Sequence, residues 1–248
     1  MAELPVKGTT PAGAATEEQA SLWVRRMFGE IAPRYDRLNT ILSFHIDAYW
    51  RRRMVKRVAD ILGRPDARVL DLCCGTAPLL IALERARGAA VLGSDFCHPM
   101  LTEARQRLSA SSLHSELFEA DALRLPIADA SLDLITVAFG FRNFANYHKG
   151  VLELRRVLKP GGLLAVLEFS KPPNRAFAAL YGWYSRRILP LIGGALSGCS
   201  VAYEYLPESV RKFPDAPGLA EEMRNGGFSS VEYELMTGGI VALHLARV

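Results

Sequence analysis

Apolar side chains recur at helical spacing along the first sixty residues of the chain. They stand four residues apart at Trp23, Met27, Ile31 and Tyr35. This spacing places them on one face of a helix. A second helical stretch, DAYWRRRMVKRVADIL (47–62), follows, with Asp47 placed to cap it. We therefore predict a helical N-terminal extension over residues 17–62.

After Pro65 the pattern changes to short apolar runs that alternate with amphipathic ones. The strand-like runs are ARVLDLCC (67–74), AAVLGSDF (89–96), SELFEAD (115–121), LDLITVAF (132–139) and GLLAVLEF (162–169). The helix-like runs between them are PLLIALERAR (78–87), PMLTEARQRL (99–108) and YHKGVLELRRVL (147–158). Such alternation predicts a parallel sheet with helices on both faces. Two more strand-like runs, joined at Gly238-Gly239, predict a closing antiparallel pair.

These patterns predict one α/β domain over residues 63–248, preceded by the helical extension. Residues 1–16 are rich in Pro, Gly, Ala and Thr, which is typical of a mobile tail. They lack the basic start and apolar stretch of a signal peptide. The apolar segment 188–203 is shorter than a membrane-spanning helix and contains Pro190.

The net charge of +4 results from 30 basic and 26 acidic residues. This balance, without interleaved aromatic and basic residues, argues against nucleic-acid binding. The basic run RRRMVKR (51–57) is either a solvated helix face or a contact with a membrane surface. We predict a cytoplasmic protein, with peripheral contact at the inner face of the membrane left open.

The four cysteines stand at positions 73, 74, 97 and 199 without CxxC spacing, and no two histidines have ligand spacing. We therefore predict a reduced protein without a metal site. Cys73 and Cys74 end the first strand, where we expect them to act as small buried packing residues.

The turn after the first strand contains one glycine, in Asp71-Leu-Cys-Cys-Gly75-Thr76-Ala77. A dinucleotide-binding turn has GxGxxG, so that a pyrophosphate can approach bare backbone. Ala77 and Pro78 make this turn a poor phosphate cradle, which argues against an NAD-dependent oxidoreductase.

Three acidic residues, Asp71, Asp95 and Asp121, lie at the ends of successive predicted strands. Asp95 ends the second strand, where a carboxylate accepts from both ribose hydroxyls. Asp121 and Ala122 end the third strand, where a carboxylate and a backbone N–H meet the edge of adenine. Phe96 is placed to pack on the adenine face. Carboxylates at three strand ends suit adenosine, and the turn lacks the glycine pattern that binds a pyrophosphate. Together these features indicate S-adenosylmethionine, which contains adenosine and no pyrophosphate.

Longer motifs make the chain resemble the ubiquinone/menaquinone biosynthesis C-methyltransferase family from about residue 21 to its end. They are FGEIAPRYDRLNTILSF, VLDLCCGT, ADALRLPIADASLDLITVAFGFRN, RVLKPGGLLAVLEFSKP, YEYLPESVRKFPD and GGIVALH. The resemblance implies a Rossmann-like class I methyltransferase with a mainly parallel seven-stranded sheet. It implies cofactor contacts at Thr76, Asp95 and Asp121-Ala122, with Asp71 and Gly75 shaping the methionine end. The acceptor it implies is a polyprenylated hydroquinone, either demethylmenaquinol or the benzoquinol of the ubiquinol pathway.

The chain departs from the family pattern at several positions near the cofactor. Glycine is usual at Ala77 and common at Cys74, an acid is common at Pro78, and serine is frequent at Ala138. His45 and Asp47 replace the usual Gly and His. Ala77 adds one methyl group to a loop that must approach the cofactor closely, which predicts weaker cofactor binding. Because Thr76 and the three strand-end acids are present, we expect binding to be retained.

Methyl transfer to a ring carbon requires an electron-rich hydroquinone aligned with the methyl donor. Arg142, just beyond the fourth strand, is our candidate catalytic residue, because a guanidinium there can stabilise a developing oxyanion directly or through a water. The alternative is an ion pair with a nearby acid. The phenylalanines around Arg142, at positions 139, 141 and 144, suit an aromatic ring.

Residues on the acceptor side are assigned as substrate-binding candidates, namely Tyr35, Asn39, Phe141, Asn143, Tyr203 and Tyr205. The apolar segment 188–203 is the expected route for a prenyl tail. A methyltransferase for another small aromatic acceptor, and a binding protein of the same fold without catalysis, are the alternatives. A homodimer is left open.

Overall fold

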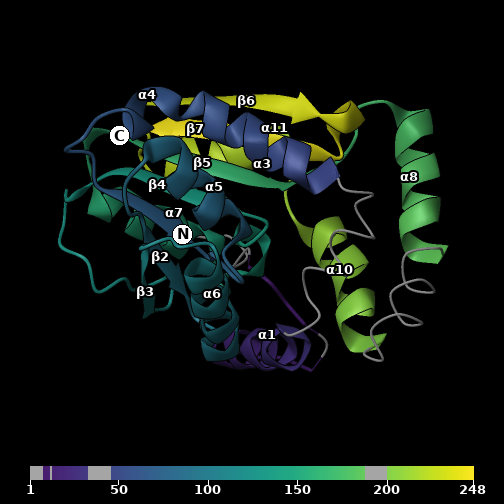
Figure 1. The fold of residues 1–248 in the computed structure, drawn as a ribbon. Helices are drawn as coiled ribbons and strands as arrows, with labels where there is room; N and C mark the ends of the chain where they lie inside the picture. Colours follow the sequence, from purple (N-terminus) through teal and green to yellow (C-terminus); the bar gives the residue numbers. More distant parts are fainter. Residues whose placement is uncertain (1–7, 12, 33–45, 188–199) are drawn as a thin grey trace.

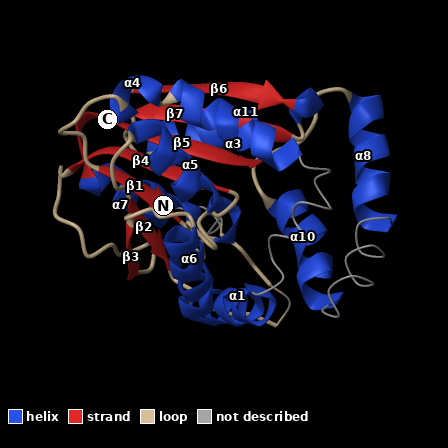
Figure 2. Ribbon diagram, in the orientation of Figure 1, coloured by secondary structure: helices blue, strands red, loops and turns tan. Residues whose placement is uncertain are grey.

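A seven-stranded sheet forms the centre of the molecule (Figures 1 and 2). The computed structural model describes residues 8–11, 13–32, 46–187 and 200–248, apart from the side chains at 185, 186 and 200–204. The strands are β1 (Val69–Leu72), β2 (Leu92–Asp95), β3 (Glu116–Glu119), β4 (Leu132–Ala138), β5 (Leu158–Phe169), β6 (Ser230–Met236) and β7 (Val241–Arg247). Their order is β3-β2-β1-β4-β5-β7-β6.

Strands β1 to β5 are parallel, whereas β7 is antiparallel to both β5 and β6. The predicted fold class and the closing antiparallel pair are therefore confirmed. The chain order reverses between β1 and β4, and in open parallel sheets this switch point is where ligands bind. Strand β5 starts at Leu158, four residues before the predicted run, because Leu158 pairs with Leu132 across a register shift.

Helices cover both faces of the sheet, and two further short helical turns lie near its carboxyl edge. They are α1 (Glu17–Ile31), α3 (Ile46–Arg57), α4 (Ala59–Leu62), α5 (Pro78–Arg87), α6 (His98–Ala110), η2 (Phe141–Asn143), α7 (Tyr147–Val157), α8 (Arg175–Arg187), α10 (Ser200–Lys212), α11 (Ala216–Asn225) and η3 (Thr237–Gly239). Figure 1 shows α8 standing at the outer edge of the molecule beyond α10.

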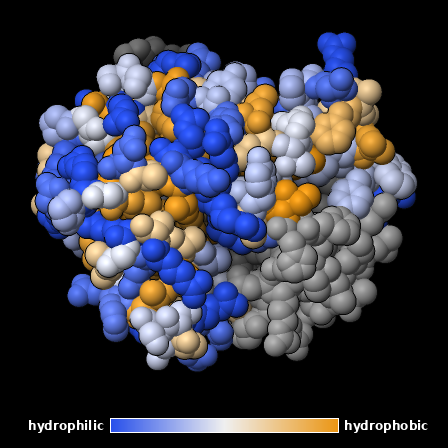
Figure 3. All heavy atoms as spheres, turned by 45° about the horizontal axis from the view of Figure 1, so that its top comes forward, coloured by the Kyte–Doolittle hydropathy of each residue, from blue (hydrophilic) through white to orange (hydrophobic). Residues whose placement is uncertain are grey.

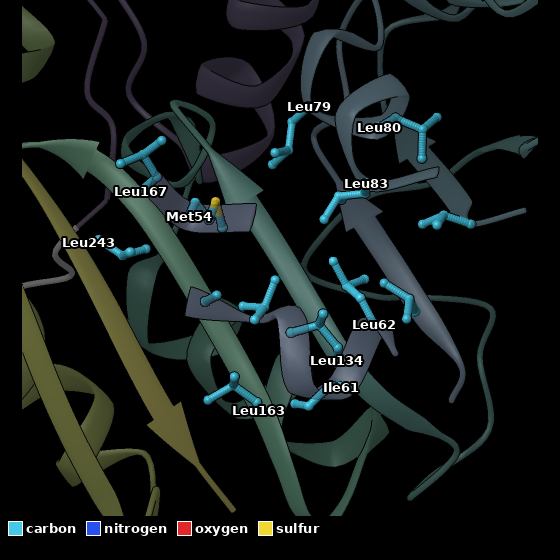
Figure 4. Packing of buried hydrophobic residues seen from close by; sticks show 14 of the residues in the cluster. Met54, Ile61, Leu62, Leu79, Leu80, Leu83, Leu134, Leu163, Leu167 and Leu243 are labelled. Carbon is cyan, nitrogen blue, oxygen red and sulfur yellow. The ribbon is translucent and has the colours of Figure 1, made fainter. Parts of the chain in front are cut away.

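Strand residues alternate between two hydrophobic cores, as the period of two requires. Val69 and Leu134 pack with α3, α4 and α5 on one face (Figure 4). Leu70 and Ile135 point to the other face and pack with α7 and α11. The cores hold the strand ends in register, which positions the residues that follow them.

The ends of the helices follow local sequence signals. Pro78 opens α5, where its missing N–H costs nothing, and Gly88 ends that helix with a left-handed φ of 71°. Asn146 caps α7 by accepting from the backbone N–H of Lys149 at 3.0 Å. Helix α1 starts in the same way, at the side chain of Thr16.

The part of the predicted tail that the structure describes packs on the domain. The backbone N–H of Thr9 donates to the carbonyl of Phe144 at 2.8 Å, and Thr9 is buried. A side chain at Gly8 would collide with the carbonyl oxygen of Ala145. Residues 8–11 are therefore bound to the domain rather than extending into solvent.

Candidate active site

A cavity of about 680 Å³ opens at the carboxyl ends of β1, β2 and β4. Its walls come from α1, α3 and α8, from the turns that follow the strands, and from η2. The volume lies within the range of pockets that enclose small molecules, about 300 to 1,000 Å³. The cavity thus lies at the switch point of the sheet, where open parallel sheets bind their ligands.

Asp71, in β1, lines this cavity with a buried carboxylate. The hydroxyl of Thr136 donates to its Oδ1 at 2.7 Å, whereas its Oδ2 is buried and has no hydrogen-bond partner in the described structure. Burial raises the pKa of Asp71 to about 7, and the nearby carboxylate of Asp95 adds to the rise. A buried oxygen without a partner is rare, and this one is suited to a ligand that brings a donor or a positive charge.

The turn after β1 approaches Asp95 through its backbone. Gly75 has a φ of 55°, a left-handed conformation that suits glycine. Its N–H donates to Oδ2 of Asp95 at 2.9 Å, while the N–H of Cys97 donates to Oδ1 at the same distance. Each oxygen keeps a lone pair for a further donor. Burial raises the pKa of Asp95 to about 6, and these hydrogen bonds oppose the rise.

Asp121 lies two residues beyond the end of β3, and its side chain is more exposed than that of Asp95. Its Oδ1 accepts from the backbone N–H of Leu123 at 2.9 Å. Phe96, Ala122 and the buried Thr76 also line the cavity. All seven residues assigned to the cofactor therefore meet around one cavity.

Cys73 and Cys74 follow β1, and both line the cavity. Burial raises the pKa of both thiols well above its ordinary value, and nearby carboxylates add to the effect. A thiol that stays protonated is a poor nucleophile. Within the described ranges, no three His, Cys, Asp or Glu side chains come together as metal ligands.

Arg142 lies in η2 and contributes to the cavity wall beside Asn143. Its guanidinium is buried and forms an ion pair with Glu168 at 3.1 Å. Oε2 of Glu168 also accepts from the backbone N–H of Arg142 at 3.2 Å. The guanidinium lies 5.4 Å from the ring centre of Phe169, in cation–π geometry. Arg142 therefore lines the cavity and is also paired with an acid, as the alternative expected, while its catalytic role stays a prediction.

Glu168 was not predicted as a site residue. It is 1% exposed near the end of β5, and burial raises its pKa while the guanidinium of Arg142 opposes that rise. The signal in the sequence was a single acid at the end of the apolar run GLLAVLEF. A charged residue is almost never fully buried unless it has a partner.

Two of the candidates on the acceptor side do not line the cavity. Phe141 is fully buried, and its ring stacks on Phe144 with centroids 4.6 Å apart. Tyr205 is buried against Trp23 with centroids 5.1 Å apart. Asn143 does line the cavity. Tyr35, Asn39, the side chain of Tyr203 and most of the apolar segment 188–203 lie outside the described residues.

Aromatic side chains form much of the remaining wall, and apart from Phe139 and Phe144 they were not predicted. Trp50 and Phe139 pack with ring centroids 5.8 Å apart, and Phe139 packs on Phe169 at 5.0 Å. Helix α8 adds Phe177, Leu180, Tyr181, Trp183 and Tyr184. Their separation in the sequence explains why no single motif revealed them.

The basic run at 51–57 forms ion pairs within the protein. Arg53 and Arg57 both pair with Glu234, and Arg51 pairs with Asp47. Met54 of the same run is fully buried. Neither predicted alternative, a solvated face or a membrane contact, describes these arginines, because acids of the same domain pair with them.

A model of the ubiE/COQ5 methyltransferase family matches residues 14–247. The chain belongs to this family. A demethylmenaquinone methyltransferase of Thermus thermophilus is 52% identical over 220 residues, covering 88% of this chain and 98% of the relative. The one of Deinococcus radiodurans is 47% identical, covering 89% and 90%. The predicted family and a methyltransferase activity that depends on S-adenosylmethionine are thereby confirmed.

Solved structures agree with the fold. A SAM-dependent methyltransferase from Aquifex aeolicus aligns with a TM-score of 0.56 at 20% identity, covering 77% of this chain and 88% of that one. The [4+2]-cyclase SpnF aligns with a TM-score of 0.63 at 16% identity, covering 96% and 98%. A cyclase on this fold shows that the fold alone does not determine the reaction.

The family's cofactor fits the observed cavity. S-adenosylmethionine carries an ammonium group and ribose hydroxyls, which are donors, and the cavity presents the unpartnered Oδ2 of Asp71 and the open lone pairs of Asp95. Ala77 packs in the core and is not among the residues that line the cavity. Among the described residues, no helix is both long and apolar enough to cross a membrane.

Proposed function

We propose that the protein methylates a ring carbon of demethylmenaquinol. The observation that carries this proposal is the buried Arg142, which lines the cavity together with Phe139, Phe144 and Phe169, in the same cavity as the strand-end acids. A cation fixed near aromatic rings suits an acceptor ring that develops negative charge on an oxygen. The names of the related proteins support the same acceptor.

In this proposal the cofactor lies along the carboxyl ends of β1, β2 and β3. Asp95 accepts from the ribose hydroxyls, Asp121 and the N–H of Ala122 meet the adenine edge, and Phe96 packs on the adenine face. Asp71, Gly75 and Thr76 surround the methionine end. The supporting geometry is the convergence of these residues on one cavity.

When bound, S-adenosylmethionine supplies an electrophilic methyl group. Arg142 would hold the acceptor oxygen and stabilise the negative charge that develops as its hydroxyl proton moves to water. Once the methyl group is on the ring, water would take the proton of the methylated carbon and the acceptor oxygen would regain a proton, so that one proton is released in all. Glu168 keeps Arg142 in place, and the aromatic wall excludes bulk water from the reacting atoms.

An acceptor assay tests the proposal. The purified protein is incubated with cofactor carrying a labelled methyl group and either demethylmenaquinol or the benzoquinol of the ubiquinol pathway, and the product is located by mass spectrometry. We expect the label on the ring carbon of the naphthoquinol. Labelling of the benzoquinol alone would overturn the proposed acceptor, and no transfer to either would favour a binding protein.

Arg142→Ala should lower kcat by about ten- to a thousandfold, with little change in cofactor affinity, because the charge is needed only as the reaction proceeds. Arg155→Ala is the matched control, since Arg155 is outside the cavity wall and bonds to the carbonyl of Gly227. If Arg142→Ala weakened cofactor binding and left kcat unchanged, Arg142 would be a binding residue instead.

We also propose that the prenyl tail leaves the cavity along α8, at a lipid surface. Leu180 and Trp183 line the cavity and yet are 62% and 55% exposed. The apolar wall thus continues from the cavity to the outside of the molecule. Figure 3 shows hydrophobic residues at the right of the molecule, where α8 stands in Figure 1, beside a mostly hydrophilic face.

Sedimentation with vesicles of anionic and neutral phospholipid tests this contact. Leu180→Glu should reduce binding to vesicles and raise KM for a long-tailed quinol, while a quinol with a short tail is turned over as before. Leu152→Glu is the control, because Leu152 is exposed on α7, away from the cavity wall. Equal binding of both variants would contradict the contact at α8.

A further inference from the structure

Residues 8–11 form a segment, here called the N-terminal strap, that packs against the residues directly after η2. Thr9 is 5% exposed and donates its backbone N–H to Phe144, directly after η2. Lys212 of α10 donates to the carbonyl of Thr10 at 2.9 Å. The strap is thus attached both to the turn that carries Arg142 and to α10. It also precedes residue 14, where the match to the family model begins.

The side chain of Thr9 starts a chain of hydrogen bonds that ends at the cavity. Its Oγ1 lies 2.7 Å from the hydroxyl of Tyr205. The Tyr205 hydroxyl donates to Oδ1 of Asn143 at 3.0 Å. A tyrosine hydroxyl has one proton, so when Tyr205 donates to Asn143 it accepts from Thr9.

The bond from Tyr205 to Asn143 leaves only one end of the Asn143 amide available to a ligand. Its oxygen is taken by Tyr205, and no acceptor for its nitrogen occurs among the described residues. Asn143 lines the cavity next to Arg142. We propose that Thr9 and Tyr205 are positioning residues that fix the Asn143 amide, so that its N–H donates to an oxygen of the hydroquinone. Tyr205 then acts through Asn143, not as a ligand of the acceptor.

The surroundings of Tyr205 hold the relay in one geometry. Its ring packs on Trp23 of α1, and its hydroxyl is reached from Thr9 on one side and from Asn143 on the other. The hydrophobic cluster around it includes Val24 and Met100. Thr9 and Tyr205 are both buried, so packing limits the movement of the two hydroxyls that hold the Asn143 oxygen.

Thr9→Val tests the relay, because valine keeps the shape of threonine and removes the hydroxyl. Valine removes the donor to the Tyr205 oxygen, so the hydroxyl is held from one side only and its position beside Asn143 is less fixed. We expect kcat/KM for the quinol to fall about three- to tenfold, the worth of one hydrogen bond. Cofactor affinity, measured by calorimetry, should stay within about twofold. Thr9→Ser keeps the hydroxyl and should restore kcat/KM.

Thr10→Val is the matched control, since Thr10 is exposed in the same strap and its carbonyl still accepts from Lys212. Tyr205→Phe should have an effect similar to Thr9→Val, and the double variant should be no worse than Tyr205→Phe, because both remove one relay. Additive losses, or a loss in Thr9→Ser equal to that in Thr9→Val, would overturn the proposal.

Because the role of Asn143 rests on the proposed acceptor, a second readout is independent of turnover. The side-chain amide signals of Asn143 in the ¹⁵N–¹H NMR spectrum are assigned by their loss in Asn143→Asp. We expect them to shift in Thr9→Val and Tyr205→Phe and to stay in place in Thr10→Val. Unmoved signals would overturn the relay even if the protein methylates the quinol. Shifted signals without turnover by the wild type would refute the proposed function and retain the relay.

Discussion

Ala77 adopts a left-handed backbone conformation, with φ 70° and ψ 25°, that costs an alanine about 1–2 kcal/mol. Its methyl group is fully buried in the core. Ala77→Gly would relieve the strain, but it loses about 0.8 kcal/mol of methyl burial and a further 0.5–1 kcal/mol, roughly, of glycine entropy. We expect the free energy of unfolding to change by less than about 1 kcal/mol, and the cofactor Kd by less than about twofold.

Calorimetric titration of Ala77→Gly with S-adenosylmethionine checks this prediction. Gly75→Ala provides the contrast, because Gly75 has a φ of 55° and lines the cavity. A methyl there is strained and faces the ligand, so it should weaken binding clearly. Tenfold tighter binding by Ala77→Gly would mean that the Ala77 methyl does crowd the cofactor.

Asp71 makes the cofactor-free protein sensitive to pH. Its pKa is raised to about 7 in the folded protein, against about 3.9 for an unperturbed aspartate. The folded state therefore holds a proton that the unfolded state releases, and stability falls as pH rises through this window. Asp95, with its pKa raised to about 6, acts in the same direction.

Asp71→Asn should remove the contribution of Asp71, because the amide stays neutral and its oxygen still accepts from Thr136. In urea unfolding, the variant should be more stable than the wild type, by a margin that widens by about 1.4 kcal/mol per pH unit between pH 5 and 7. Above about pH 7 the margin should level off. A margin independent of pH would show that Asp71 does not titrate in this range.

At the scale of elements, one buried ion pair attaches η2 to β5. Glu168 bonds to both the guanidinium and the backbone N–H of Arg142, with the two side chains 1% and 5% exposed. Glu168→Gln leaves the buried guanidinium without its counter-charge. We expect a loss of about 3–5 kcal/mol in the free energy of unfolding and at least about a tenfold fall in kcat. Urea titration and single-turnover kinetics measure the two effects.

Glu232→Gln is the control for Glu168→Gln, because Glu232 is 68% exposed in its pair with Arg57. It should cost about 1 kcal/mol at most. Adding Arg142→Gln to Glu168→Gln should recover part of the stability, since no buried charge is then left alone, while activity stays low. If Glu168→Gln were as stable as the Glu232 variant, the pair would not hold η2.

The elements that could be predicted from the sequence are those with local signals. Strand β4 is a mostly apolar run, α5 begins at a proline and is followed by a glycine, and Asp95 ends the strand-like run of β2. Contacts between distant elements have no local pattern. The bond of Thr9 to Tyr205 spans 196 positions and the ion pair of Arg142 with Glu168 spans 26.

The acceptor side was less predictable for the same reason. Phe141 was assigned to the acceptor side because it belongs to the motif FGFRN. In the 3₁₀ turn, however, Phe141 packs in the core, whereas the next residue, Arg142, lines the cavity. Trp50 lies one helical turn before Met54, on the same face of α3. That face packs on the sheet, and this packing places Trp50 at the cavity. The acids after β1 and β2 were predictable because parallel strands end at one edge.

At the scale of the whole molecule, the cavity joins segments that are far apart in the chain. Its wall includes residues of α1, α3, α8 and α10 as well as the turns after β1 to β4 (Figure 1). A ligand that binds there binds the folded state alone, so it should stabilise the protein as a unit. At a concentration 100 times its Kd, such a ligand contributes about 2.7 kcal/mol.

For a protein of this size we expect S-adenosylmethionine at that concentration to raise the Tm by about 5 to 10 °C. The same concentration of NADH should leave the Tm unchanged, because the turn after β1 lacks a phosphate cradle. Asp121→Ala should reduce the shift strongly, since Asp121 is exposed at the cavity and the variant can fold without it. Glu116→Ala, an exposed residue of β3 outside the cavity wall, should keep the full shift. Differential scanning calorimetry measures all four cases, and a full shift in Asp121→Ala would place the adenine elsewhere.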